Sequence, residues 1–225
     1  MSEEELIAAA VETEKLSHVD LYGIGTNLTC FSFIQADEEK MECLAEMRRK
    51  VENAAGHTLE IVSGGNSAAL DLMMRGGICE GVDSFRLGES LLFGKERSRY
   101  TFLPGTRNDG FILECEVVEA KVKPSLPWGT EGVDSYGRKP VFTNRGEKRK
   151  KVICTIGRQD FDAETATPVD EGILILGASS DHLMLDVTDS VKEYKVGDIV
   201  ELRLGYFSVL RAFTSPYVEK IFLKK

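Results

Sequence analysis

Residues 59–93 read LEIVSGGNSAALDLMMRGGICEGVDSFRLGESLLF, and this stretch decides the fold. Two short apolar runs, residues 59–62 and 84–87, are each followed by glycine, small polar residues and a helix-forming segment. The pattern predicts two strands, each of which passes through a glycine-containing turn into a helix, at residues 67–74 and 89–93. Strands that alternate with helices are typical of a parallel sheet covered by helices.

The residues before this stretch continue the same alternation. A helix is predicted at residues 3–15, because Ser2 can act as its N-cap and its first turn is acidic. A strand is predicted at residues 19–24, and a second helix at residues 37–55, ending before Gly56. The first part of the chain is therefore expected to hold three strands of a parallel sheet.

After about residue 110 the apolar residues follow a period of two instead. From residue 111 to residue 117 they alternate with Glu114 and Glu116, which is typical of a half-buried strand. Further strands are predicted at residues 152–156, 173–176, 182–187, 200–204 and 217–223. We therefore predict the fold class α/β followed by all-β, with a boundary near residue 105 in a connection that contains Pro and Gly, residues 99–109.

The composition limits both the size of the fold and its partners. The chain has 225 residues, fewer than the ~250 that are typical of a complete (β/α)8 barrel. Its net charge of −9 has the wrong sign for binding a nucleic-acid backbone, so no nucleic-acid partner is expected. The longest basic run, residues 145–151, leads into an apolar strand and is interpreted as its solvated entrance.

Cysteine usage and the N-terminal residues bear on location. The five cysteines are odd in number and scattered, which favours reduced thiols in a cytoplasmic protein. The first residues are acidic, unlike a signal peptide, and no apolar run approaches the ~18 residues of a membrane span. We therefore expect no membrane partner. The three histidines are isolated from one another, so we expect no metal site either.

Residues 63–67 and 86–90 place backbone N–H groups and short side chains where a strand meets a helix. Such junctions bind phosphate, and their glycines permit close approach. Neither junction has the glycine pattern of a nucleotide-binding loop. A purely structural interpretation also exists: Gly64 and Gly65 make a tight turn, and Asn66 or Ser67 only caps a helix.

Arg86 lies at the end of a predicted strand, where a charge is costly to bury unless a partner needs it. One such partner is the pyridine nitrogen of pyridoxal phosphate (PLP), which arginine contacts in some enzymes. Because arginine keeps its proton, it would leave the ring nitrogen unprotonated. That arrangement suits exchange of an α-proton.

Six motifs follow one another along the chain, and their combination is more specific than any single one. They are GIGTNLTCF at residues 23–31, SGGNS at 63–67, FRLGE at 85–89, GRQD at 157–160, GASSDH at 177–182 and TSPY at 214–217. Their order resembles the alanine racemase family of PLP enzymes, most closely its ornithine racemase-like branch. The resemblance implies the C-terminal part of a PLP-binding (β/α)8 barrel, about three βα units in residues 1–105, followed by a β domain in residues 106–225.

The resemblance also implies which residues contact the cofactor. The phosphate would be held at the two junctions, in part by the Glu89 amide, and Arg86 would face the pyridine nitrogen. The implied cofactor-binding residues are Asn27, Ser63, Gly65, Asn66, Ser67, Arg86, Gly88, Glu89 and Tyr217, of which Asn66, Ser67, Gly88 and Glu89 hold the phosphate.

Some of these positions depart from the family pattern. Asn27 stands where alanine racemases have a histidine against the cofactor ring, and Ser63 stands where they have a histidine that supports the arginine. Tyr217 lies within a residue of the family's phosphate-binding tyrosine.

Racemisation needs one base on each face of the planar carbon. In the family these are a Schiff-base lysine and a tyrosine from the partner subunit, and Thr130 stands where that tyrosine would fall. Tyr136 or Asp134 is the candidate catalytic substitute, although a polar loop without a catalytic role also explains this segment. Ser180 and Asp181 match a substrate-binding turn, where the acidic group would read the distal ammonium of a basic amino acid.

The function implied by the resemblance is interconversion of the L and D forms of an amino acid, either a basic one such as ornithine or alanine. The enzyme would be a PLP-dependent isomerase and a homodimer. The alternative function is a non-catalytic PLP-binding, ligand-binding or assembly module that derives from a racemase.

No segment of this sequence corresponds to the first barrel strand, which carries the family's lysine. Three strands also cannot close a barrel. The chain is therefore predicted to be nearly inactive alone and to need a complementary N-terminal half chain. A gene fragment, one partner of a split enzyme and a degenerate homologue are the explanations that this leaves open.

Overall fold

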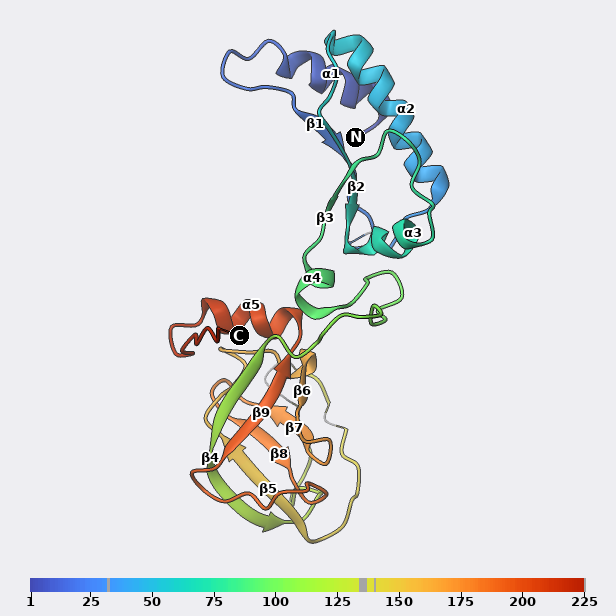
Figure 1. Cartoon of the computed structure of the whole chain (residues 1–225). Coiled ribbons are helices and arrows are strands. Elements are labelled where there is room, and N and C mark those ends of the chain that lie inside the picture. Colours follow the sequence, from blue (N-terminus) through green and yellow to red (C-terminus); the bar gives the residue numbers. More distant parts are fainter. Residues whose placement is uncertain (32, 134–136, 140, 225) are drawn as a thin grey trace. The chain divides into compact units, whose positions relative to one another are not determined.

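The computed structural model describes residues 1–31, 33–133, 137–139 and 141–224 (Figure 1). The chain divides into two compact units, Met1–Arg107 and Asn108–Lys225, and each is described by itself. None of the helices in the described ranges is both long and apolar enough to span a membrane.

The first unit is a three-stranded parallel sheet with helices beside it (Figure 1). Its strands are β1 (Gly23–Gly25), β2 (Ile61–Asn66) and β3 (Ser84–Arg86), in the order β1-β2-β3. The helices are α1 (Glu3–Thr13), α2 (Glu38–Ala55), η1 (Ser67–Ala69), α3 (Leu70–Met74) and α4 (Glu89–Phe93). The predicted alternation of helices and parallel strands is confirmed.

Local sequence signals fix the ends of the two long helices. The Ser2 hydroxyl accepts the Glu5 N–H at 3.3 Å, while the Glu5 carboxylate accepts the Ser2 N–H at 2.7 Å, so α1 begins with a capping box. Asp37 caps α2 by accepting the Lys40 N–H at 2.9 Å. Gly56 ends α2 with a φ of +83°, which a glycine adopts without strain.

The apolar core of this unit lies between α2 and the sheet. Met41 and Leu44 of α2 pack with Val62 of β2, Leu72 of α3 and Val82. A smaller apolar cluster joins α1 to α2 and to Leu59, which lies just before β2. These contacts hold the sheet so that the carboxyl ends of its strands stay together.

Strand β2 is longer than predicted and takes in the glycine pair. The sequence predicts a strand at residues 59–62 and a turn at Gly64 and Gly65, whereas β2 continues through both glycines to Asn66. A Cβ on Gly64 would lie 2.6 Å from Phe85 Cε1. Packing against Phe85, rather than turning, therefore explains Gly64. Strand β1, in contrast, is shorter than predicted: it occupies Gly23–Gly25, which overlaps only the last two residues of the predicted range 19–24.

The second unit is a six-stranded antiparallel sheet that nearly closes on itself (Figure 1). Its order is β6-β9-β4-β5-β8-β7, and the strands at the two ends of this order, β6 and β7, contact each other. The long strand β4 pairs with both β5 and β9. The strands are β4 (Ile112–Lys123), β5 (Arg149–Cys154), β6 (Ala166–Pro168), β7 (Leu174–Ala178), β8 (Leu183–Asp186) and β9 (Ile199–Leu204), with the short helix η2 (Ala163–Thr165) before β6.

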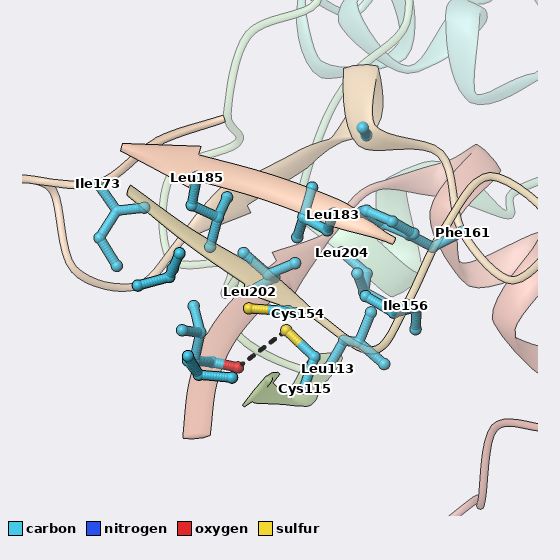
Figure 2. Close-up of a cluster of buried hydrophobic side chains, with 14 of the residues drawn as sticks. Leu113, Cys115, Cys154, Ile156, Phe161, Ile173, Leu183, Leu185, Leu202 and Leu204 are labelled. Atoms are coloured by element: carbon cyan, nitrogen blue, oxygen red, sulfur yellow. Dashed lines mark hydrogen bonds between the residues drawn. The ribbon is translucent and has the colours of Figure 1, made fainter. Parts of the chain in front are cut away.

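Apolar side chains fill the inside of this sheet (Figure 2). Leu183, Leu185 and Phe161 are fully buried there. Cys115 and Cys154 lie in the same core as free thiols. Contact with Cys154 and burial together raise the pKa of the Cys115 thiol above its usual range, so this thiol stays protonated.

The second domain is not all-β, contrary to the prediction. Residues 206–214 form helix α5 (Tyr206–Thr214), and residues 217–223, predicted as a strand, join no strand pair in the described part of the chain. Ser208 of α5 is fully buried, and its hydroxyl donates to the Asp162 carbonyl at 2.6 Å. After the helix, Pro216 lacks the N–H that a strand would use for pairing.

Candidate functional site

The two predicted phosphate junctions meet at the side chain of Ser67. Its hydroxyl accepts the N–H groups of Gly88 and Ser90, each at 3.3 Å, and lies 3.1 Å from the Ser90 hydroxyl. Ser67 and Ser90 are both buried. The structure thus joins the start of η1 to the start of α4, at the carboxyl ends of β2 and β3. Because α4 has only five residues, its helix dipole is small. The polar character of this junction therefore comes from individual backbone N–H groups.

Asn66 is committed to contacts within the protein. Its Oδ1 accepts the Ala68 N–H at 2.8 Å, so it caps η1. Its Nδ2 donates to Asn27 Oδ1 at 2.8 Å and to the Leu28 carbonyl at 3.2 Å. The structural interpretation of Asn66 as a helix cap is therefore confirmed, and Asn66 also holds the loop that carries Asn27.

Arg86 is exposed, so the expectation that a burial cost explains this arginine is wrong. Its guanidinium donates to the Thr26 carbonyl at 2.9 Å and to the Ser63 hydroxyl. Ser63 is buried with 7% of its surface exposed, and Thr26 follows β1. The arginine on β3 is therefore oriented by groups from the two neighbouring strands.

Two glycines of the junctions differ in burial, because Gly88 is exposed and Gly65 is buried. Gly88 is exposed, and no atom lies within 4 Å of a Cβ added to it, so there is open space beside this residue. Gly65 has a φ of +123°, where other residues are strained, and the nearest atom to an added Cβ is the Thr26 carbonyl oxygen at 3.9 Å. The predicted role of Gly65 and Gly88 in ligand binding stays a prediction.

Glu89 contributes a charged side chain as well as the predicted amide. Its carboxylate is 8% exposed and forms an ion pair with Arg97 at 2.7 Å. Although burial opposes it, the hydrogen bond to Glu89 raises the pKa of Arg97. The sequence gives no signal for this pair because the two residues lie eight positions apart, in a short helix and a loop. Ser90 was also missed, although it belongs to the junction at residues 86–90.

Ser180 and Asp181 form an exposed turn between β7 and β8. The Ser180 hydroxyl donates to Asp181 Oδ1 at 2.9 Å, and this hydrogen bond lowers the pKa of Asp181. The N–H groups of Arg158 and Gln159 donate to the carbonyls of Ser179 and Ser180, at 2.8 and 3.0 Å. The motif at residues 157–160 therefore holds the predicted substrate-binding turn.

Tyr217 is tied to the same motif. Its N–H donates to the Ser215 hydroxyl at 3.0 Å, and that hydroxyl donates to Asp160 at 2.6 Å. Asp160 and Ser215 are buried, whereas the Tyr217 side chain is exposed. The other two predicted residues of this unit, Tyr136 and Asp134, lie outside the described residues.

The described lysines of the first unit have other contacts. Lys15 pairs with Glu12 at 2.5 Å, Lys40 pairs with Asp37, and Lys50 pairs with Glu3 at 2.8 Å. The Lys95 ammonium lies 4.3 Å from the centre of the Tyr100 ring. Strands β1, β2 and β3 carry no lysine. The first unit thus has the junction at Ser67 and an arginine that is oriented by two neighbouring strands, and its strands carry no lysine.

Comparison with known proteins identifies amino-acid racemases as relatives. No family model matches the chain. It is 44% identical over 209 residues to an ornithine racemase of Acetoanaerobium sticklandii, and the aligned region covers 93% of this chain and 59% of that relative. It is 42% identical over 214 residues to a lysine racemase of Thermotoga maritima, and the aligned region covers 95% of this chain and 60% of that relative. The chain thus spans about three-fifths of the length of these curated relatives.

A solved structure shows the same fold. An alanine racemase of Clostridium difficile 630 matches 94% of this chain and 55% of its own length, with a TM-score of 0.51 at 22% identity. The parallel α/β part and the antiparallel β domain therefore correspond to about half of that structure.

Proposed function

We propose that this chain, a homologue of the alanine racemase family over part of its length, supplies the phosphate-binding end of the barrel and the β domain of a PLP-dependent amino-acid racemase. The observation that carries the proposal is the contact of Ser67 with Gly88 and Ser90, on the edge of the sheet that also holds Arg86. The identity to racemases of ornithine and lysine supports it.

The described residues of the first unit are compatible with the phosphate and the ring nitrogen of PLP. Open space beside Gly88 lets a ligand approach the loop amides. The Ser67 hydroxyl accepts two N–H groups, so its own proton can be donated to the Ser90 hydroxyl, 3.1 Å away, or to an anion that takes the place of that contact. Arg86 is exposed and held by Ser63 and Thr26, so it can donate to an unprotonated nitrogen.

Each of these residues then has a definite task. Bound PLP would supply the electron sink that makes the α-proton of the amino acid acidic. The Ser67 hydroxyl and the amides of Gly88 and Glu89 would bind the phosphate through charge-assisted hydrogen bonds. Arg86 would keep the ring nitrogen unprotonated, because a guanidinium does not give up its proton. Ser63 would hold the arginine in that orientation.

Proton transfer at the α-carbon needs a base on each face. We assign one base to Tyr136 or Asp134 of the β domain. We assign the other to a lysine that β1, β2 and β3 do not carry. This division explains why the chain alone should be nearly inactive, although it holds the phosphate site.

A basic amino acid, such as ornithine or lysine, is the proposed substrate. The Asp181 carboxylate has a lowered pKa and is exposed, so it stays ionised at neutral pH and can pair with a distal ammonium. Both curated relatives act, by name, on such amino acids. Ser180 would orient Asp181 through its hydrogen bond.

The proposed partners are further strands of the barrel and a second copy of the enzyme. Among the described strands, β1 and β3 each pair on one side only, which leaves two unpaired sheet edges. Strands that complete a barrel would cover these edges and bring the lysine. A homodimer would bring the β-domain base of one copy to the cofactor of the other.

The test is reconstitution. The chain is produced alone and together with the part of the Acetoanaerobium sticklandii ornithine racemase that it does not match, and NMR in deuterated water follows exchange of the α-proton of D- and L-ornithine with PLP present. Exchange is expected only for the pair, and Arg86→Glu should change the absorbance of bound PLP. A pair that binds PLP but exchanges the α-proton of no amino acid would rule out the racemase. That result would favour the alternative function, a non-catalytic PLP-binding module. The absence of lysine from β1, β2 and β3 is the observation that supports this alternative.

A further inference from the structure

The segment that follows α4 folds back onto the Ser67 junction. The Arg97 main-chain N–H donates to the Ser67 carbonyl at 3.4 Å, and the Arg97 guanidinium pairs with Glu89 at 2.7 Å. Glu89 is the first residue of α4 and follows Gly88, whose N–H reaches the Ser67 hydroxyl. Arg97 therefore contacts both sides of the junction.

A buried carboxylate fixes the turn that carries Arg97. Glu96 is 3% exposed, and it accepts the N–H groups of Ser98, Arg99 and Thr101 at 2.8, 2.8 and 3.1 Å. It also accepts the hydroxyls of Ser98 and Thr101. These hydrogen bonds close residues 96–101 into a turn, so the backbone that carries Arg97 is held by contacts other than the ion pair with Glu89.

The Glu89 side chain has little contact with water and therefore needs its cation. It is 8% exposed, and Arg97 is its ion-pair partner among the described residues. A buried carboxylate without a cation is strongly disfavoured, because burial removes its hydration. Through this ion pair Arg97 holds Glu89 against the turn at residues 96–101. Because Glu89 is the first residue of α4, the start of this helix is held there as well.

We propose that the Glu89–Arg97 ion pair positions the phosphate site, by holding the amides of Gly88 and Glu89 beside the Ser67 hydroxyl. The inference rests on the proposed function, because the phosphate is that of PLP. Arg97 acts here as a positioning residue, since its guanidinium is engaged by a carboxylate. Loss of either partner should therefore weaken phosphate binding, even though loss of the Glu89 charge removes a negative charge near the phosphate.

Pyridoxamine 5′-phosphate and pyridoxamine are suitable probes, because they differ only in the phosphate and neither forms a bond to a lysine. Calorimetric titration of the whole chain with each probe gives two affinities. The affinity for pyridoxamine 5′-phosphate divided by that for pyridoxamine is an affinity ratio that reports the contribution of the phosphate. Arg97→Gln and Glu89→Gln should each lower this ratio, the former by about tenfold. Arg99→Gln is the matched control, because Arg99 is 64% exposed and lies 3.5 Å from Asp71, so its ratio should stay at the wild-type value.

A second measurement needs no ligand. The amide NMR resonances of Gly88 and Glu89 should shift in Arg97→Gln and stay in place in Arg99→Gln. Arg97→Lys keeps the positive charge, so this variant should retain most of the wild-type affinity ratio. If Arg97→Gln does not fold, Arg97→Lys is measured in its place.

The outcomes separate the two proposals. A wild-type ratio and unshifted amides in Arg97→Gln, or tighter phosphate binding in Glu89→Gln, would overturn the positioning role alone. A wild-type chain that binds both probes equally would overturn the proposed phosphate site, and the positioning role with it.

Discussion

Gly64 and Gly88 lie in neighbouring motifs but differ in their tolerance for a side chain. A Cβ on Gly64 would lie 2.6 Å from Phe85 Cε1 and 2.8 Å from Val82 Cγ1, whereas no atom lies within 4 Å of one on Gly88. Gly64→Ala should therefore lower the free energy of unfolding of the first unit by about 1–3 kcal/mol through overpacking. Gly88→Ala should lower it far less. Denaturant titration followed by circular dichroism checks this, and equal losses in the two variants would contradict it.

Individual site residues could be predicted from the sequence, but their partners could not. Arg86 and Ser63 stand out because both lie where a strand ends. The guanidinium of Arg86, however, is held by Ser63 and by Thr26, which are 23 and 60 residues away in the chain. No local pattern encodes contacts of that separation, so the arginine was expected to be buried and is instead exposed.

At the scale of elements, one buried carboxylate joins β5 to β8. Asp186 has a side chain that is 1% exposed, and its Oδ2 accepts from Arg149 Nε at 2.8 Å. Burial alone would raise the pKa of Asp186, but Arg149 and the two hydrogen bonds from Thr188 outweigh it and lower this pKa. A carboxyl with a lowered folded pKa stabilises the fold above its unfolded pKa, and this stability is lost as the pH falls through the folded pKa.

The second unit should therefore lose stability as the pH falls below about 4, the unfolded pKa of an aspartate. The difference in free energy of unfolding between wild type and Asp186→Asn should shrink over that range. Urea titrations above and below this pH measure it. Asp189→Asn is the control, because Asp189 pairs with the same arginine but its side chain is 64% exposed. A difference that does not depend on pH would contradict the prediction.

Elements with local signals were predictable, and elements set by distant contacts were not. The ends of α2 follow from Asp37 and Gly56, and α4 occupies its predicted residues. Helix α5 was missed although its apolar residues follow a helical period, at positions 206, 209, 210 and 213. What no local pattern marks is its Ser208, whose hydroxyl donates to the Asp162 carbonyl, 46 residues earlier. A buried serine that depends on such a contact looks, in sequence, like any other serine.

At the scale of the whole molecule, the chain holds separate cores. The apolar cluster of the β domain shares no residue with the clusters of the first unit. Calorimetry should therefore show two unfolding transitions. Gly64→Ala should lower the temperature of one and Asp186→Asn that of the other. One transition that both variants move would contradict this.

The order of six motifs predicted the racemase relationship, and the two curated relatives confirm it. The residues of the proposed reaction stay predictions, because the two bases that it needs would come together only in an assembled site. The candidates Tyr136 and Asp134 lie outside the described residues, and β1, β2 and β3 carry no lysine.

The thiols in the core of the β domain make the chain a reporter of its own opening. Cys115 and Cys154 are 4% and 0% exposed, whereas Cys30 and Cys43 are exposed. A thiol reagent reacts with the exposed pair at once, but it reaches the buried pair only when the sheet opens. The half-buried Cys79 of the first unit adds a phase of its own, so Cys79→Ser is the background in which the slow phase of labelling times the openings of the β domain.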